Sequence, residues 1–387
     1  MSNTFDAIIV GVGAMGSAAC LALAKRGLRV LGIEQFSTPN DRGSSHGATR
    51  IIRKAYFEHP DYVPLLHETY DLWRQIENAA AADLFHRVGL LLVGVPTGDV
   101  ITGVLRSAAA HQLDIHSVSE REFDQRFGMF HRPEGAAALF EPNAGYLLVE
   151  ECVQTMCALA ERQGATILRH RRVTDWSIDS HGVRVTTDNE TFLADRLVIC
   201  GGAWAGRLLT YLAPALEVRR KVQLWFACDP DRFDVASGTP VFAYDLPEGF
   251  YYGFPSIERD DAKIAEHSGR EIVSDADTLD RELHSADTQR VVAFVGRFVR
   301  GATTRVTRHS ACMYTMSPDQ HFFVDRHPRY ENVSFAAGFS GHGFKFAPVI
   351  GEILADLAIN GATHRPAGFL RVGARTTPVV LACGRPS

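Results

Sequence analysis

The stretch Asp6-Ala-Ile-Ile-Val-Gly-Val-Gly-Ala-Met-Gly16 decides the fold. Its β-branched first half predicts a strand, and the glycine motif that follows opens a helix-forming run over residues 17–26. Gly27 predicts the end of that helix, and a second strand over 28–33 leads into Glu34. Strand, G-x-G-x-x-G, helix, strand and acid, all within about 30 residues, is the pattern of a dinucleotide-binding unit.

Each residue of this motif has a physical task. Gly11 allows the tight turn, Gly13 lets the backbone approach a pyrophosphate, and Gly16 lets the helix pack against the sheet. Met15 lies between Gly13 and Gly16 and is also predicted to bind the nucleotide. Glu34 can accept hydrogen bonds from ribose hydroxyls, which favours FAD or NAD over NADP, and the fingerprint alone does not choose between those two.

The composition is that of an ordinary folded protein. The chain has 387 residues, of which 46% are hydrophobic and 22% charged, and its formal net charge of -5 excludes a nucleic acid or an anionic membrane as the main partner. Apolar runs such as Leu90–Val95 are too short to span a bilayer, which takes about 20 residues. The first residues lack a basic signal-peptide region, so we expect a cytoplasmic protein.

The seven cysteines form no C-x-x-C pair, which argues against a disulfide framework or a zinc site.

Two more glycine-rich junctions follow predicted strands further along the chain. The strand over 192–200 runs into Gly201-Gly-Ala-Trp204, and the strand over 333–337 runs into Gly338–Phe346, followed by a helix that ends at Gly361. These junctions predict a single nucleotide domain that is assembled from separated segments and interrupted by a strand-rich domain. Other predicted elements are helices over 62–77, 149–162 and 205–212, and strands over 88–95, 136–140, 183–187, 218–227 and 250–254.

Five separated motifs carry a family resemblance. They are Gly11–Gly16, Gly43–Arg53, Tyr251–Pro255, Ala311–Thr315 and Phe339–Phe346. In these motifs, and in their order from about residue 5 to about residue 360, the chain resembles the monomeric sarcosine oxidase and N-methyltryptophan oxidase family of flavoproteins. The resemblance implies an FAD-dependent oxidation of a secondary N-methyl amine to an imine. Reoxidation by O2 would yield H2O2, and hydrolysis of the imine would yield formaldehyde and an amino acid.

The fold class implied is mixed α/β, with an FAD-binding Rossmann-like domain and a discontinuous antiparallel-sheet substrate domain. The implied partners are a small N-methyl amino acid and O2, with no nucleic acid and no membrane, and the family is often monomeric. The predicted boundaries are 1–86, 145–213 and 319–370 for the FAD domain, 87–144 and 214–318 for the catalytic domain, and 371–387 for a tail.

The resemblance also assigns the cofactor site. Cys312 would attach FAD covalently through a thioether, and a cationic neighbour such as Arg308 or His309 would favour its thiolate. Backbone at the last glycine junction would approach the flavin ring and donate N–H groups to it. The remaining cofactor-binding residues are His46, Val173, Gly202, Gly341, Gly343, Phe344 and Lys345.

Arginines and lysines supply the predicted substrate site. Arg50 and Arg53 are three residues apart, on one helical turn or an irregular loop, among small and apolar neighbours where a surface charge would be out of place. A guanidinium is well suited to bind a carboxylate with two hydrogen bonds. By resemblance, Arg53 and Lys345 bind the substrate carboxylate, while Arg50 lies against the flavin.

The other catalytic residues come from the resemblance alone. Lys263, which the sequence places on a half-exposed strand, would activate O2 with its positive charge. Tyr252, His267 and Tyr314 would surround the amine. Where small-substrate members carry methionine, this chain has Ala243, which leaves room for a bulkier side chain.

Two segments depart from the family pattern or lie outside it. A changed loop over 256–261 is a second sign of a larger substrate, and residues 372–387 are predicted to form a docked or loose tail.

Three alternatives stay open at this point. An oxidase of the same fold could act on a cyclic imino acid or a glycated amino acid. An NAD-dependent dehydrogenase is supported only by the glycine motif and Glu34. A flavin-binding redox sensor without turnover is disfavoured because the charged residues of the site are retained.

Overall fold

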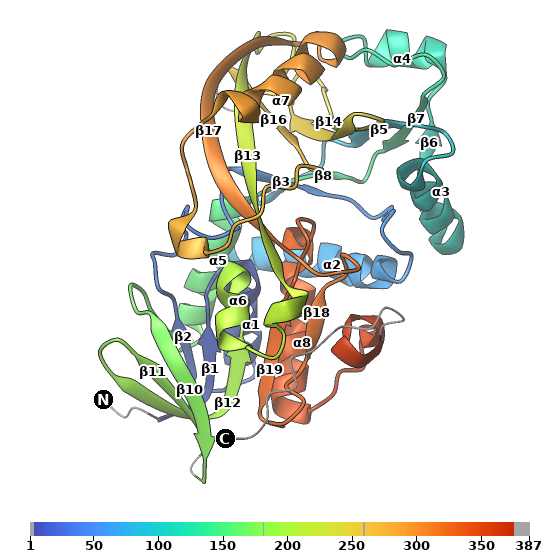
Figure 1. Cartoon of the computed structure of the whole chain (residues 1–387). Coiled ribbons are helices and arrows are strands. Elements are labelled where there is room, and N and C mark those ends of the chain that lie inside the picture. Colours follow the sequence, from blue (N-terminus) through green and yellow to red (C-terminus); the bar gives the residue numbers. More distant parts are fainter. Residues whose placement is uncertain (1–3, 181, 258–259, 375–387) are drawn as a thin grey trace.

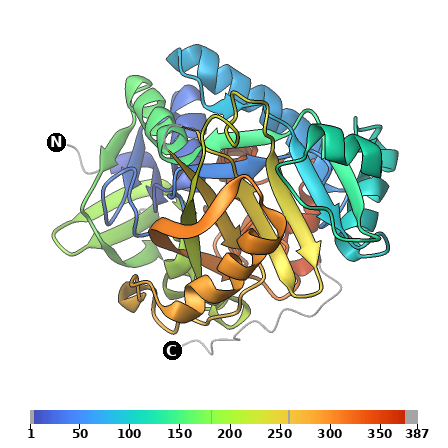
Figure 2. The same ribbon diagram turned by 90° about the horizontal axis from the view of Figure 1, so that it is seen from above.

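The computed structural model describes residues 4–180, 182–257 and 260–374. Two large sheets organise the chain. In Figure 1 the sheet that contains β1 and β12 lies below, the sheet that contains β13 and β17 lies above, and α2 lies between them. Figure 2, seen from above, shows the upper sheet with α7 across it.

The first large sheet has a parallel core. β12, β1, β2 and β9 are neighbours and run in the same direction, β19 pairs parallel to β12, and the remaining strands add antiparallel pairs at the edges. This arrangement is the doubly wound sheet that the opening motif predicts. Its strands are β1 (Thr4–Val10), β2 (Val30–Ile33), β9 (Thr166–Leu168), β10 (Val173–Asp179), β11 (Gly182–Thr187), β12 (Thr191–Ile199), β18 (Phe323–Arg326) and β19 (Val333–Ala337).

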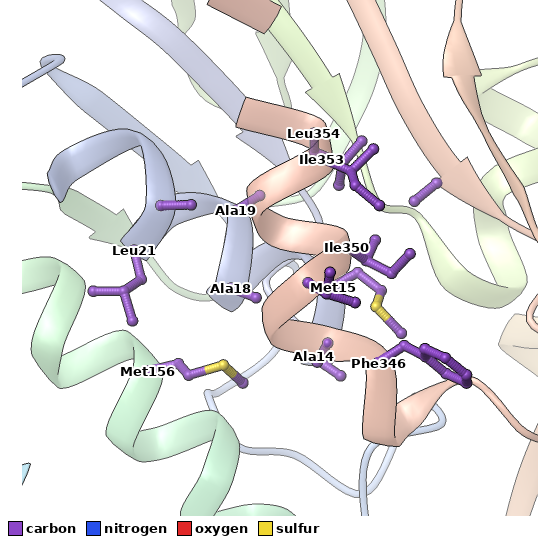
Figure 3. Packing of buried hydrophobic residues seen from close by; sticks show 14 of the residues in the cluster. Ala14, Met15, Ala18, Ala19, Leu21, Met156, Phe346, Ile350, Ile353 and Leu354 are labelled. Carbon is purple, nitrogen blue, oxygen red and sulfur yellow. The ribbon is translucent and has the colours of Figure 1, made fainter. Parts of the chain in front are cut away.

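Small residues let α1 and α8 pack closely together. A Cβ atom added at Gly351 would lie 2.6–2.7 Å from the backbone and side chain of Ala18, so α1 and α8 can approach closely only because position 351 is glycine. Figure 3 shows Met15 of α1 beside Ile350 of α8, and Met156 on the neighbouring α5. The helices are α1 (Ala14–Lys25), α2 (Tyr62–Ala80), α5 (Val149–Arg162) and α8 (Ala347–Asn360).

The second large sheet has the order β17-β13-β16-β15-β14-β5-β7-β6. It is antiparallel, as predicted, except that β14 pairs parallel to β5. Its strands are β5 (Leu90–Gly94), β6 (His116–Ser117), β7 (Ala137–Glu141), β13 (Glu217–Cys228), β14 (Val241–Leu246), β15 (Gly249–Phe254), β16 (Asp261–Glu266) and β17 (Ala302–Met316). The accompanying helices are α3 (Asp99–His111), α4 (Glu120–Arg126) and α7 (Ser285–Phe298).

A small third sheet connects the two halves. It consists of β3 (Thr49–Ile52), β8 (Gly145–Leu148) and β4 (Phe85–His86), and β3 and β8 lie between the two large sheets in Figure 1. Arg50 is therefore in a strand and Arg53 directly follows it, so the helical turn or irregular loop expected for this pair is wrong. Strand geometry sends successive side chains to opposite faces, so Thr49 and Arg50 face different surroundings.

Most predicted elements are present, with one clear difference. The helix expected over 205–212 is only α6 (Ala205–Leu208), because Leu209 has φ -120 and ψ 69 and the chain then enters a separate 3-10 turn that contains Pro214. The 3-10 helices are η1 (Gly202–Trp204), η2 (Ala213–Ala215), η3 (Ala276–Thr278), η4 (Phe344–Phe346), η5 (Gly368–Leu370) and η6 (Val372–Ala374).

The strands of each large sheet fall inside the segments predicted for one domain, but the domain boundaries themselves stay a prediction. The predicted tail lies almost entirely outside the described residues, as does part of the loop over 256–261. Within the described ranges, none of the helices is long and apolar enough to cross a membrane.

Candidate active site

An elongated cavity of about 550 Å³ lies at the carboxyl ends of the parallel strands. Nine of the residues predicted to bind the cofactor line it, whereas Gly16 lies behind its wall. A Cβ at Gly16 would be 1.8 Å from the carbonyl oxygen of Gly11, so Gly16 serves the contact between helix and strand, as predicted. The nine are Gly11, Gly13, Met15, Glu34, Val173, Gly202, Gly341, Gly343 and Phe344.

The cavity fits a dinucleotide. A Cβ at Gly13 would meet only the Ser45 hydroxyl, at 3.5 Å, and one at Gly202 would meet no described atom within 4 Å. The protein's own packing therefore leaves these two positions free for a bound group. Glu34 lines the same cavity, where its carboxylate accepts hydrogen bonds from the Val12 N–H at 2.9 Å and the Phe36 N–H at 3.0 Å. Burial raises the pKa of Glu34.

A second cavity, of about 100 Å³, adjoins the first. The two share Arg50, Tyr314, Gly341 and Phe344 in their walls, so a ring bound at the end of the nucleotide cavity would face the second one. We call the second one the substrate cavity.

Arg53 and Lys345 both line the substrate cavity and are only 8% and 5% exposed. The Arg53 guanidinium donates to both carboxylate oxygens of Glu58 at 2.8 Å and to the Ala55 carbonyl at 2.7 Å. The Lys345 ammonium donates to the His342 carbonyl at 2.7 Å. Burial, together with the Arg53 charge, lowers the pKa of Lys345 to about 7. Two cations thus converge on one small cavity.

Glu58 balances these cations, and sequence reasoning missed it. Although burial opposes ionisation, the Arg53 charge is the largest of the effects that hold the pKa of Glu58 at about 2. His342 lies beside it and is itself kept neutral by burial, which lowers its pKa to about 4. The Nε2 of His342 lies 2.9 Å from the Gln320 carbonyl, which can only accept a hydrogen bond, so this nitrogen carries the proton.

Three aromatic side chains close the other side of the substrate cavity. The His267 Nδ1 lies 3.2 Å from the Tyr314 hydroxyl, and Tyr252 is hydrogen-bonded to Tyr314. Burial, with a smaller contribution from the Lys221 charge, lowers the pKa of His267 to about 3. His267 is therefore neutral at physiological pH, and the structure brings all three predicted residues together.

Cys312 is fully buried on β17 and does not itself line either cavity, but it contacts Arg50, which lines both. Its sulfur lies 3.7 Å from an Arg50 nitrogen. Burial opposes ionisation, but the His46 imidazole and the Arg50 charge lower the pKa of Cys312 to about 6. A thiolate is thus favoured at neutral pH, as the attachment of FAD would require.

Arg308 and His309 are close to Cys312 in sequence, but they are not the groups that lower its pKa. Arg308 instead pairs with Asp261 at 3.0 Å, and the Nε2 of His309 lies 3.2 Å from the Arg281 carbonyl. Arg308 and His309 lie four and three residues before Cys312 on an extended strand, which separates them from its sulfur. β3 and the loop before it place Arg50 and His46 close to the sulfur instead.

Lys263 is 2% exposed, so the half-exposed position expected for it is wrong. It donates to the carbonyls of Gly47 and Thr49, both at 2.7 Å, and to the Thr49 hydroxyl at 3.3 Å. Burial and the Arg50 charge lower its pKa well below the usual range. It lies on the opposite side of β3 from Arg53 and, together with His46, lines a third cavity rather than the substrate cavity.

Residues 6–357 match the family model described as FAD dependent oxidoreductase. The chain belongs to this family. FAD is therefore its cofactor, in agreement with the fit of the nucleotide cavity, and the NAD alternative is set aside.

Two relatives narrow the assignment to one group within the FAD-dependent oxidoreductases. The monomeric sarcosine oxidase of Streptomyces avermitilis is 40% identical over 377 residues, which cover 95% of this chain and 97% of that one. The N-methyl-L-tryptophan oxidase of Yersinia pestis is 36% identical, covering 92% and 95%. The predicted membership of the sarcosine oxidase and N-methyltryptophan oxidase group is confirmed, and the protein is a flavin-dependent amine oxidase.

Solved structures show the same fold. NikD, an unusual amino acid oxidase essential for nikkomycin biosynthesis, superposes with a TM-score of 0.84 at 24% identity, over 95% of this chain and 97% of that chain. The L-proline dehydrogenase from P. horikoshii gives 0.82 at 19%, over 96% and 97%. The predicted fold class is therefore confirmed.

Several residues of this flavoprotein's site carried no usable sequence signal. Glu58 follows Arg53 by five positions, and Glu141 lies on β7, with its carboxylate 2.6 Å from the Lys54 N–H. Neither belongs to a recognisable motif. His342 could have been predicted from the sequence, because it lies inside the glycine junction at Gly341–Gly343.

Proposed function

We propose that this chain oxidises N-methyl amino acids with a sizeable apolar side chain, converting the amino acid, O2 and water into the demethylated amino acid, formaldehyde and H2O2. The observation that carries the proposal is the substrate cavity, in which two buried cations face an apolar wall and which adjoins the FAD cavity. FAD, when bound, would accept the two electrons from the N-methyl group and pass them to O2.

The substrate carboxylate would bind between Arg53 and Lys345. Both side chains line the cavity, and hydrogen bonds between a cation and a carboxylate are among the stronger ones in proteins. Glu58 already holds one edge of the Arg53 guanidinium, so a substrate carboxylate must share or replace that contact. The two cations would fix the substrate's orientation.

The amine would lie beside Tyr252, His267 and Tyr314. A secondary amine must lose its proton before it can donate electrons, and the neutral His267 adds no positive charge that would compete with this group. The hydrogen-bonded pair of Tyr314 and His267 can orient the amine through one hydroxyl. We expect turnover to rise with pH until the bound amine is deprotonated.

The side-chain compartment follows from strand register. Tyr252 pairs with Ala243, Ala243 with Leu92, and Leu92 with Leu139, so four residues form one row across neighbouring strands. All four line the substrate cavity. At about 4.8 Å per strand, the row extends roughly 14 Å from the amine end. Further apolar residues of this wall are Leu90, Val104, Ile115 and Phe250.

The small side chain of Ala243 keeps the row open. It is 4% exposed and lies between Tyr252 and Leu92, so a larger residue there would separate the amine end from the apolar wall. Burying an apolar substrate side chain against this lining stabilises the complex by roughly 25 cal/mol per Å² of apolar surface buried. This supports a substrate larger than sarcosine.

The experiment that tests the function is a product assay. The purified protein would be incubated with N-methyl amino acids of increasing side-chain size, and formaldehyde and H2O2 would be measured together. We expect equal amounts of both, with the largest kcat/KM for a bulky apolar side chain. Peroxide without formaldehyde would contradict demethylation and favour a cyclic imino acid or a glycated amino acid.

Ala243→Met tests the side-chain compartment. We expect kcat/KM for a bulky substrate to fall by about 10- to 100-fold, because overfilling a packed site costs about 1–3 kcal/mol, while sarcosine turnover changes little. Ala109→Met, on the exposed face of α3, makes the same substitution outside the cavity and serves as the control. An equal loss for both substrates would contradict the assignment.

Covalent attachment through Cys312 belongs to the same proposal. Acid precipitation should leave the yellow colour in the protein pellet of the wild type and release it from Cys312→Ser. Colour retained in the pellet of the variant would place the attachment elsewhere.

A monomer and a cytoplasmic location remain predictions. Sedimentation of the holoenzyme would test this oligomeric state.

A further inference from the structure

One connection of the second large sheet reaches the FAD cavity, which is the cavity of about 550 Å³. It is the last part of the segment between β16 and α7, residues 271–284, and it contains η3. In Figure 1 this light-orange segment descends from the upper sheet towards α6. We call residues 271–284 the strap.

The strap is anchored to its own sheet by a buried arginine. The side chain of Arg220, on β13, is 2% exposed and donates to the carbonyls of Asp280 and Glu282 at 2.8 and 2.6 Å. It also pairs with the carboxylate of Asp287, in the first turn of α7, at 2.6 Å. The base of the strap is therefore fixed relative to β13.

Asp277, in η3, holds one wall of the FAD cavity. Its carboxylate accepts hydrogen bonds from the Trp204 indole N–H and an Arg207 N–H, both at 2.7 Å, and from Arg172 at 3.1 Å. All three donors line the FAD cavity. Apolar packing supports this contact, because Trp204 packs against the buried cluster to which Ala276 belongs.

Arg281 holds a second wall of the same cavity. Its guanidinium donates to the carbonyls of Asp41 and Arg42, at 2.8 and 2.9 Å. These two residues lie between Asn40 and Gly43, which both line the FAD cavity. The strap thus reaches two walls with two side chains, both from outside the cavity.

The two walls also touch each other. The rings of Phe36, in the loop that leads to Arg42, and of Trp204 have centroids 5.7 Å apart, and both residues line the FAD cavity. Because the strap is fixed to β13, widening the cavity between these walls requires the contacts of Asp277 or Arg281 to break. Partly exposed charge pairs are individually weak, so these contacts can open while the sheets stay folded.

We propose that Asp277 and Arg281 are cofactor-positioning residues: they hold two walls of the FAD cavity closed around the cofactor, and FAD enters and leaves only when the strap releases these walls. The inference uses the FAD cofactor that family membership establishes and is independent of the proposed substrate. The strap also reaches the attachment region, because Arg281 donates to the carbonyl of Ala311, next to Cys312, at 3.2 Å.

The test measures FAD exchange rather than activity. In a Cys312→Ser background, release of FAD on dilution would be followed by its rise in fluorescence, and uptake by the apoprotein by the quenching of added FAD. We expect Asp277→Ala and Arg281→Met each to speed both rates at least about threefold, the scale of one exposed charge pair, and the double variant about tenfold. Because both rates rise, the dissociation constant should change much less than either.

Arg184→Met is the matched control. Arg184 pairs with Asp179 on the hairpin of β10 and β11, and their side chains are 42% and 36% exposed, close to the 41% and 32% of Arg207 and Asp277. Both rates should match the parent in this control. The melting temperature of each apoprotein would be recorded as well, because a general loss of stability lowers it without making uptake faster. Arg281→Lys, which keeps a charged donor, should recover most of the parent's slow uptake.

A second readout uses the protein with its native Cys312. Hydrogen exchange of the holoenzyme should become faster over residues 201–208 in Asp277→Ala and over residues 40–45 in Arg281→Met, since each side chain holds a different wall. Unchanged or slower uptake in the double variant, or unchanged exchange in both walls, would overturn the inference. If Cys312→Ser keeps its colour after acid precipitation, the proposed attachment is contradicted, and hydrogen exchange alone decides the role of the strap.

Discussion

Lys345 and Lys263 are both buried, and β3 separates the cavities that they line. Lys345 shares its cavity with the carboxylates of Glu58 and Glu141 and with the guanidinium of Arg53. Lys263 donates instead to two carbonyls and one hydroxyl. Lys345, which donates to the His342 carbonyl, thus has charged side chains as cavity neighbours, whereas Lys263 is held by two carbonyls and one hydroxyl.

The difference has a physical consequence. Contacts between charged side chains can be exchanged for a ligand that carries the same charge, so the Arg53–Glu58 pair can open to an incoming carboxylate. The backbone carbonyls of Thr49, on β3, and of Gly47, just before it, cannot be exchanged in this way. The first arrangement suits binding and release, while the second suits a charge that must stay in place throughout turnover.

The largest effect should come from removing the fixed charge. Lys263→Met should slow reoxidation by O2 by about 10²–10³-fold, the usual cost of losing one electrostatic stabiliser. Anaerobic reduction by substrate, measured in the same stopped-flow experiment, should change by less than about threefold because Lys263 does not line the substrate cavity. Equal losses in both half-reactions would erase the distinction between the two lysines.

The second-largest effect should come from Arg53, whose contact with Glu58 can be exchanged for a substrate carboxylate. Removing Arg53 alone would leave Glu58 as a buried, unpaired carboxylate, so the double variant Arg53→Met with Glu58→Gln is the cleaner test. We expect the dissociation constant of a carboxylate inhibitor to rise about 10- to 100-fold, corresponding to a charged hydrogen bond of about 1.5–3 kcal/mol. Glu58→Gln alone controls for loss of the acid, and unchanged affinity in the double variant would exclude carboxylate binding by Arg53.

Nine of the residues predicted from sequence for the nucleotide site line one cavity, and most of them could be selected because their geometry is local. Gly11, Gly13 and Gly16 lie within six consecutive residues at the junction of β1 and α1, and a close approach of neighbouring or bound atoms explains each of them. The helix that ends at Gly361 is similar: the residue has φ 71, a conformation that glycine adopts without strain. Local conformational rules could therefore predict these elements.

The electrostatics could not be predicted in this way. The cations nearest to Cys312 in sequence are not those nearest to its sulfur, because a strand separates neighbours and the fold brings Arg50 from 262 residues away. Lys263 looked half-exposed because its sequence neighbours include Asp261 and Glu266, but β16 lies inside the sheet, between β13 and β15. Burial and charge balance are properties of long-range packing, so only the assembled structure shows them.

A titration tests the contribution of the Lys345 charge to carboxylate binding. Lys345 has a pKa of about 7, so it is charged below that pH and loses its charge as the pH rises. Glu58, with a pKa of about 2, and His342, with a pKa of about 4, do not change between pH 6 and 9. The dissociation constant of an amine-free carboxylate should therefore rise by up to about tenfold between pH 6 and 9, since the loss of one charged hydrogen bond costs about 1.5 kcal/mol.

Isothermal titration across this pH range would measure the effect, with Lys345→Met as the control that should show weak binding and a flat profile. A pH dependence that survives in Lys345→Met would assign the titration to another group. Arg53 remains charged throughout and keeps the site occupied at high pH, because the pKa of its guanidinium is raised above the ordinary value despite burial.

The smallest effect should come from Thr49, whose hydroxyl is the weakest of the three contacts to Lys263 at 3.3 Å. Thr49→Val keeps the shape of the strand and both carbonyl contacts, so the ammonium should stay in place and reoxidation should slow by only about threefold, within the ~0.5–1.5 kcal/mol of one hydrogen bond. The comparison with Lys263→Met is informative because both variants act on the same cavity. If the backbone fixes the charge, losing one side-chain hydroxyl must matter far less than losing the charge. A loss in Thr49→Val as large as that in Lys263→Met would instead show that the hydroxyl positions the ammonium, and the contrast between a fixed and an exchangeable lysine would fail.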